Sequence, residues 1–107
     1  MREVFARVRN GDTRVADLYA DDAVVAYSAG GRVVGREAIR AFYQHTIDRL
    51  HPQPQLEAIL EAPPLYVAVV DVMSSAARYR AVDLFTLNDD GIQSLEIYSQ
   101  GSAPPSQ

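Results

Sequence analysis

The chain has 107 residues, the size of one domain, and its 10 Lys and Arg against 14 Asp and Glu give a net charge of −4. The cations do not cluster, so we expect no nucleic-acid partner, because phosphate binding needs grouped positive charge. The absence of cysteine excludes disulfides, thiolate zinc sites and thiol nucleophiles.

Apolar residues at three- and four-residue steps predict three helices in the first half of the chain. The first helix covers residues 1–9. Asp12 can cap a short second helix, which runs out at 20–22 before an alternating strand at 23–27. A glycine turn follows, and residues 35–50 then form the third and longest helix.

The second half of the chain predicts strands. A strand-like run at 55–61 has prolines on both sides, which favours the edge of a sheet. Two longer runs, 65–73 and 76–87, predict a hairpin. The turn at 88–91 contains Asn, two Asp and Gly, and it leads into a last strand at 92–100.

The extent of the domain and the location of the protein follow from the same pattern. We expect one domain at residues 1–100 and a disordered tail at 101–107. The longest apolar run, 65–70, is too short to span a bilayer, and Met1 leads directly into charged residues. We therefore expect a cytoplasmic protein that does not contact a membrane.

Asp83 is the main candidate for chemistry. Strand alternation places it in a mostly apolar row with Ala77, Tyr79, Ala81, Phe85 and Leu87. A carboxyl group in such a row must be paired, hydrogen-bonded, or kept neutral by a raised pKa. The alternative to a functional acid is a structural one, which bonds a buried tyrosine such as Tyr19 or Tyr43.

The order of these elements and four sequence motifs resemble one superfamily over nearly the whole chain. The motifs are GD with LYADDAVV, then GREAIRAFY, AVDLFTLNDDGI and LEIYSQ. They resemble the SnoaL-like and ketosteroid-isomerase-like branch of the nuclear transport factor 2-like superfamily. The resemblance implies an α+β cone with a cystatin-like fold, in which three N-terminal helices pack on a strongly curved antiparallel sheet. This fold hosts many functions, so it does not by itself name the reaction.

The resemblance carries over only part of the isomerase site. Asp83 falls on the aspartic acid of the isomerase oxyanion hole, which is kept neutral by its apolar surroundings. Tyr27 occupies the position of the general base, and Val4 that of the oxyanion-hole tyrosine. A phenol is a poor base at neutral pH and valine donates no hydrogen bond, so the isomerase base and main donor are missing. Tyr27 can still act as a hydrogen-bond donor beside Asp83; the alternative is an aromatic that only lines the pocket.

Other reactions of the fold fit less well. Epoxide hydrolases of this fold need an arginine between two pocket aspartates, but Arg78 and Arg80 point away from Asp83 and Ile97 stands in the inward row of the last strand. The pair Asp21-Asp22 lacks matching metal-ligand spacing, and there is no glycine-rich phosphate loop. We therefore expect neither a metal nor a cofactor.

The sequence leaves two functions open. One is a small-molecule pocket protein of the isomerase or cyclase type that acts on a hydrophobic carbonyl compound, with Asp83 as acid or base and Tyr27 as donor. The other is a non-catalytic ligand-binding or dimerisation module in which Asp83 is structural. Whether the protein is an enzyme stays open at this point.

The expected partners are a small hydrophobic ligand and a second copy of the chain. Eight residues are expected to line the pocket: Val4, Val8, Tyr19, Phe42, Tyr43, Phe85, Leu95 and Ile97. The outward row of the sheet is too apolar for solvent, so we expect a homodimer through this face. The apolar residues of that row are Val67, Val69, Val82 and Leu84.

Overall fold

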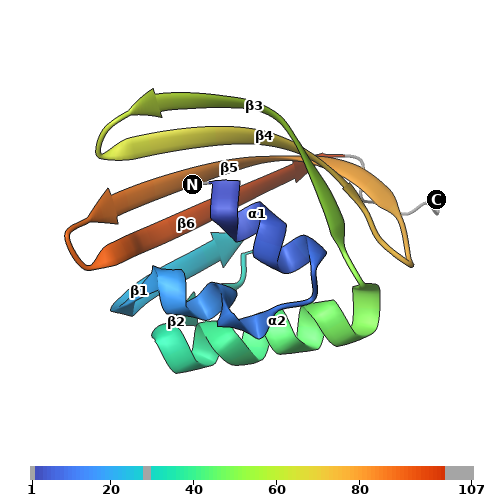
Figure 1. Cartoon of the computed structure of the whole chain (residues 1–107), viewed down its shortest axis with the longest axis horizontal. Coiled ribbons are helices and arrows are strands. Elements are labelled where there is room, and N and C mark those ends of the chain that lie inside the picture. Colours follow the sequence, from blue (N-terminus) through green and yellow to red (C-terminus); the bar gives the residue numbers. More distant parts are fainter. Residues whose placement is uncertain (1, 28–29, 101–107) are drawn as a thin grey trace.

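A computed structural model describes residues 2–27 and 30–100, so the tail expected to be disordered lies outside the described residues. The elements in chain order are α1 (Arg2–Arg9), the 3₁₀ helix η1 (Thr13–Leu18), β1 (Tyr19–Tyr27), β2 (Arg32–Val34), α2 (Arg36–Leu50), β3 (Gln53–Ala62), β4 (Leu65–Met73), β5 (Arg78–Asn88) and β6 (Gly91–Gln100) (Figure 1). Helices therefore come first and strands dominate the second half, as the periodicity predicts.

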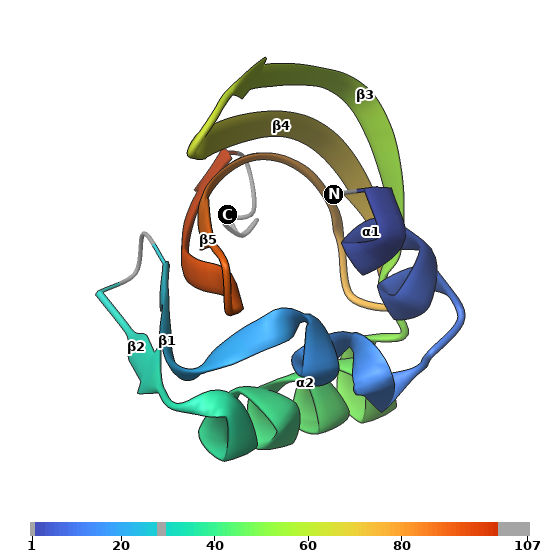
Figure 2. The same cartoon turned by 60° about the vertical axis from the view of Figure 1, so that its left-hand side comes forward.

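The strands form one six-stranded sheet in the order β2-β1-β6-β5-β4-β3. Neighbouring strands are antiparallel, except that β1 and β6 run parallel. Register shifts mark bulges in β3, between Leu56 and Ala58, and in β6, between Ile92 and Ser94; a bulge bends a strand and increases its twist. Figure 2 shows the sheet arching over α1 and α2. The expected α+β cone is confirmed, and β3 lies at the sheet edge as expected.

The segment after Asp12 differs in part from its prediction. Asp12 does cap a short helix, and its Oδ1 accepts a hydrogen bond from the Arg14 amide at 2.9 Å. The helix does not continue to 20–22, however, because β1 begins at Tyr19. Tyr19 is fully buried and pairs with Ile92 of β6, so a contact distant in sequence decides the boundary.

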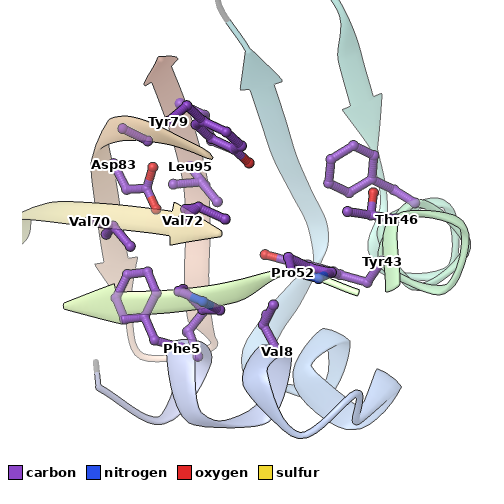
Figure 3. A pocket seen from close by; sticks show the side chains of 15 residues that line it. Phe5, Val8, Tyr43, Thr46, Pro52, Val70, Val72, Tyr79, Asp83 and Leu95 are labelled. Carbon is purple, nitrogen blue, oxygen red and sulfur yellow. The ribbon is translucent and has the colours of Figure 1, made fainter. Parts of the chain in front are cut away.

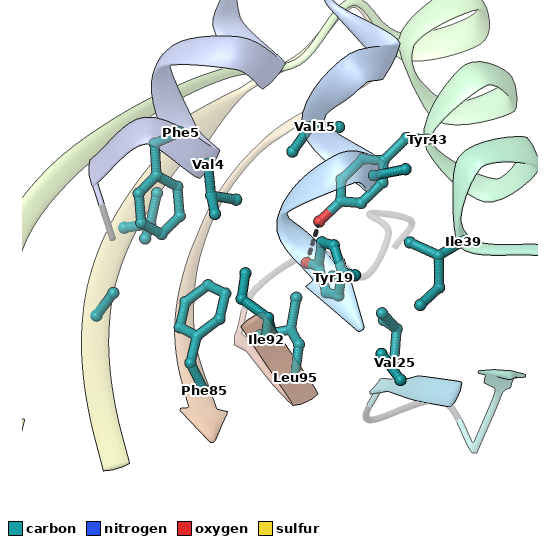
Figure 4. Packing of buried hydrophobic residues seen from close by; sticks show 14 of the residues in the cluster. Val4, Phe5, Val15, Tyr19, Val25, Ile39, Tyr43, Phe85, Ile92 and Leu95 are labelled. Atoms are coloured by element: carbon teal, nitrogen blue, oxygen red, sulfur yellow. Dashed lines mark hydrogen bonds between the residues drawn. The ribbon is translucent and has the colours of Figure 1, made fainter. Parts of the chain in front are cut away.

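The hydrophobic core lies between the helices and the concave face of the sheet (Figure 4). Val4 and Phe5 of α1 and Ile39 of α2 point into it, and the sheet contributes Phe85 and Leu95. All five are buried, with exposed fractions of 5% or less. This packing places Phe5 of α1 against Phe85, on the strand that carries Asp83, while α2 packs on η1, β1 and β2.

Gly91 ties the turn between β5 and β6 to the rest of the core. Its φ is 111°, a backbone conformation that other residues rarely adopt. A Cβ at this position would lie 2.7 Å from the carbonyl oxygen of Leu18, at the end of η1. The turn can therefore approach η1 only because it has no side chain here.

Candidate functional site

Asp83 sits in the middle of β5 and faces the concave side of the sheet. Its neighbours across the sheet are Ala68 on β4 and Ile97 on β6. Its exposed fraction is 8%, and it is the only buried charged residue in the part of the chain that the structure describes. The apolar row predicted by strand alternation therefore exists, and it holds a buried carboxyl group.

Nothing among the described residues bonds the buried oxygen of Asp83 and so explains its burial. Its Oδ1 is buried and has no hydrogen-bond partner among the described residues. The hydroxyls of Tyr19 and Tyr43, which a structural aspartate was expected to bond, instead bond each other at 2.7 Å (Figure 4). Burial without a partner penalises the charged form and raises the pKa of Asp83 to about 7. The direction of the pKa shift expected from the sequence is confirmed.

Asp83 opens onto a cavity of about 130 Å³ between the two helices and the sheet (Figure 3). Its walls come from α1, α2, the start of β3, and β4 to β6, and most of the side chains are apolar. The lining residues with a polar side-chain atom are Tyr43, Thr46, Tyr79 and Asp83. A few polar groups in an apolar hollow are typical of a small-molecule site.

Hydrogen bonds hold α1 over this cavity. The guanidinium of Arg9 donates to the Pro54 carbonyl from two nitrogens, at 2.7 and 3.1 Å. The amide of Gln53 donates to the Arg9 carbonyl at 3.0 Å. Because Pro54 itself lines the cavity, these bonds join α1 to β3 at the cavity wall.

Six of the eight residues expected to line the pocket do so: Val4, Val8, Phe42, Tyr43, Leu95 and Ile97. Tyr19 and Phe85 do not, because both are fully buried behind the lining. The ring of Phe85 packs edge-on against Phe5 at 6.0 Å between centroids. Tyr19 supports the wall through its bond to Tyr43.

Tyr27 lies outside the Asp83 cavity, which corrects the expectation that the two act side by side. Tyr27 pairs with Ile97, and Ile97 pairs with Asp83, so one strand separates them and their backbones are about 10 Å apart. The Tyr27 ring stacks on Phe42 at 5.8 Å and covers Gly31, where a Cβ would collide with it. It therefore supports a lining residue instead of reaching the carboxyl.

Tyr79 is a lining residue that the sequence argument did not select. It stands four residues before Asp83 in the same inward row, and only the small Ala81 lies between them. Burial raises the pKa of Tyr79, and the negative charge of Asp83 raises it further. Figure 3 shows the two side chains on the same wall of the cavity. The strand alternation that places Asp83 on the inner face places Tyr79 there as well, so the sequence pattern was sufficient to identify it.

Among the described residues, no cationic side chain lines the cavity. Arg80, on the opposite face of β5, pairs with Asp71 of β4 at 3.1 Å, as its outward position predicts. Within 2–27 and 30–100, no group of three or more His, Cys, Asp and Glu residues is placed to hold a metal ion. In the same ranges, no helix has the length and apolar character needed to cross a membrane.

Comparisons with known proteins identify relatives of this chain. A family model described as the SnoaL-like domain matches residues 1–95. No curated protein matches the chain. The structural matches share at most 22% identity with it in the three cases below, so they show the fold alone.

One similar structure is a provisionally named ketosteroid isomerase from Kribbella flavida, with a TM-score of 0.85, 18% identity, and coverage of 97% of this chain and 77% of that chain. Another is the epoxide hydrolase/cyclase-like enzyme SalBIII, which functions in pyran ring formation in the polyether salinomycin, with a TM-score of 0.82, 17% identity and coverage of 92% and 86%. A third is a provisionally named polyketide cyclase from Sinorhizobium meliloti, with a TM-score of 0.78, 22% identity and coverage of 87% of each chain.

Proposed function

We propose that this chain, which belongs to the SnoaL-like domain family, binds a small hydrophobic carbonyl compound in the Asp83 cavity and catalyses an isomerase- or cyclase-type proton transfer on it. Similar structures include proteins named as an isomerase and as cyclases, which supports this class of reaction. The proposal about this chain, however, rests on its own site residues.

The observation that carries the proposal is the unpartnered, buried oxygen of Asp83 in an apolar cavity. A pKa of about 7 gives both protonation states near neutral pH, as a proton shuttle requires. Ionised Asp83 takes a proton from the carbon next to the carbonyl, and the electron pair of that C–H bond forms the enolate. The protonated carboxyl then returns the proton to another atom of the ligand.

The size of the cavity restricts the ligand. A volume of about 130 Å³ is close to that of a cavity of roughly 150 Å³ that holds one benzene ring. A compound with several fused rings would extend beyond the cavity. We therefore propose a substrate whose reacting part is a single ring or a short chain, with the carbonyl near Tyr79 and Asp83.

The test is hydrogen exchange at carbon, which needs no knowledge of the natural substrate. Cyclopentanone in deuterated buffer near pH 7 should lose its α-hydrogen signals faster in the presence of the protein, as followed by proton NMR. The Asp83→Asn variant should lower this rate by a factor of about 10² to 10⁴, the usual contribution of a general base. Asp89→Asn, at an exposed turn position, removes the same charge and should leave the rate unchanged.

An exchange rate that is the same in the Asp83→Asn variant contradicts the proposal. Saturable binding of cyclopentanone without any exchange favours the second candidate, a non-catalytic ligand-binding module. The mostly apolar lining is the observation that supports this second candidate, because it provides binding area with few groups for chemistry.

We also propose that the outer sheet face forms a homodimer. In the single chain this face leaves Val82 37% exposed and Tyr98 52% exposed. Apolar and aromatic residues of this kind are typical of the centre of an interface. Light scattering at micromolar concentration should give twice the mass of one chain, and Val82→Arg should reduce it to one chain. A single-chain mass for the unmodified protein contradicts the dimer.

A further inference from the structure

We propose that the Asp83 cavity also binds a small protonated amine, with the N–H group on the carboxylate of Asp83 and the alkyl groups against the aromatic rings of the lining. This inference goes beyond the proposed reaction, because it concerns a cation where the reaction concerns a neutral carbonyl compound. It uses the same cavity but needs no catalysis.

The first step of the argument is charge. Ionised Asp83 is an acceptor with a buried oxygen that no described residue satisfies. The other titratable groups that line the cavity are the phenols of Tyr43 on α2 and Tyr79 on β5, and neither carries a positive charge. The remaining lining side chains on α1, α2 and β3 to β6 are uncharged. The nearby cation, Arg9, is engaged with the Pro54 carbonyl.

A buried carboxylate without a counter-ion is costly, and a ligand that brings both a positive charge and an N–H donor removes the cost. The ammonium ion must itself leave water, so the gain depends on how well it is hydrated. Alkyl substituents reduce that hydration and give the ligand apolar surface. The chemistry of the site therefore favours a secondary or tertiary amine over free ammonium.

The second step is the aromatic content of the walls. Phe5, Phe42, Tyr43 and Tyr79 all line the cavity. The rings of Phe42 and Tyr43 meet edge to face, with 5.5 Å between centroids and 72° between planes. The π face of an aromatic ring attracts a cation, and the effect is stronger where water is excluded. The walls therefore suit the charge and the alkyl groups of the same ligand.

The third step is size, and it selects the probe. A benzene-sized ligand fills a cavity of this volume, so we choose N-methylpyrrolidine, which stays protonated between pH 5 and pH 8. Cyclopentanone is its neutral counterpart, because both are five-membered rings with the same number of non-hydrogen atoms. The two probes differ in charge much more than in shape.

The experiment is an NMR titration of the full chain with each probe between pH 5 and pH 8 at constant ionic strength. With a pKa of about 7, the ionised fraction of Asp83 rises ~100-fold over this range and the neutral fraction falls ~10-fold. N-methylpyrrolidine affinity should therefore rise by up to ~100-fold with pH. Cyclopentanone carries no charge, so its affinity should show no such rise.

Two variants assign the effect to Asp83. Asp83→Asn should abolish the pH-dependent binding of N-methylpyrrolidine, whereas Asp89→Asn should keep it. N-methylpyrrolidine affinity that is flat or falls with pH in the unmodified protein overturns the inference, and this measurement does not depend on whether the variant folds. If the unmodified protein exchanges the α-hydrogens of cyclopentanone but shows no pH-dependent binding of N-methylpyrrolidine, only the inference is overturned. If it binds N-methylpyrrolidine in this way but does not exchange cyclopentanone, only the proposed reaction is overturned.

Discussion

Asp71 and Asp83 lie on neighbouring strands of the same sheet but on opposite faces, and their surroundings differ completely. On the outer face, Arg80 donates to Asp71 and holds the pKa of that carboxyl below its ordinary value. On the inner face, Asp83 is buried without a partner and its pKa is raised to about 7. The first acid is satisfied by the protein itself, whereas the second has a buried oxygen with no partner among the described residues.

The largest expected effect concerns stability and pH. The pKa of Asp83 is higher in the folded protein than in the unfolded chain. Its contribution to the free energy of unfolding is therefore fully present below pH 3.8 and is lost as the pH rises to about 7. Between pH 5 and pH 8 the unmodified protein should lose about 3 kcal/mol of unfolding free energy from this group. Urea unfolding at several pH values measures it.

The matched variants decide whether Asp83 causes this loss. Asp83→Asn cannot ionise, so its unfolding free energy should stay nearly level over the same range. Asp89→Asn removes an exposed charge of the same kind and should keep the full pH dependence. If the free energy of unfolding depends on pH equally in Asp83→Asn and in the unmodified protein, other groups cause this dependence. Asp83 and Asp71 would then not differ in the way described above.

A second comparison separates the two tyrosines near the site. Tyr79 lines the cavity and Tyr27 lies behind Phe42. Tyr79→Phe should weaken cyclopentanone binding about five- to tenfold, the value of one hydrogen bond, while Tyr27→Phe should change it less than twofold. NMR titration near pH 6 measures both affinities. A larger effect of Tyr27→Phe would mean that its hydroxyl reaches the ligand after all.

The smallest expected effect is on the outer face. Because the folded pKa of Asp71 is lowered, its stabilising contribution is present above the unfolded pKa and is lost as the pH falls through the folded pKa. Asp71→Asn should therefore cause a slight loss of stability at pH 7 that shrinks in concentrated salt, since exposed ion pairs are screened. Thermal unfolding at low and high salt measures it. A large loss that salt does not alter would contradict the contrast between the two faces.

The parts of the fold that were predictable are those set by local periodicity. Residues 35–50 and the strands of the second half show their helical or alternating pattern directly, and the same alternation places Asp83 on the inner face. The start of β1 was not predictable in this way. The strand begins at Tyr19 because Tyr19 pairs with Ile92 of β6, which lies some seventy residues later.

The same distinction separates the predictable and unpredictable parts of the site. Burial and a raised pKa for Asp83 follow from its own strand. The separation of Tyr27 from Asp83 follows from the strand order β1-β6-β5, which no local pattern contains. The prolines that precede residues 55–61 predict only the edge of a sheet, and the packed structure reveals that Pro52 and Pro54 also line the cavity.

The eight-residue helix α1 connects ligand occupancy to the folding of the chain itself. A helix of this length is not stable alone, so it exists through its tertiary contacts, among them the Arg9 bonds to β3. Val4, Phe5 and Val8 of α1 also line the cavity, so a bound ligand adds to those contacts. Ordering of α1 and ligand binding are thus linked equilibria, in which each favours the other by the same free energy.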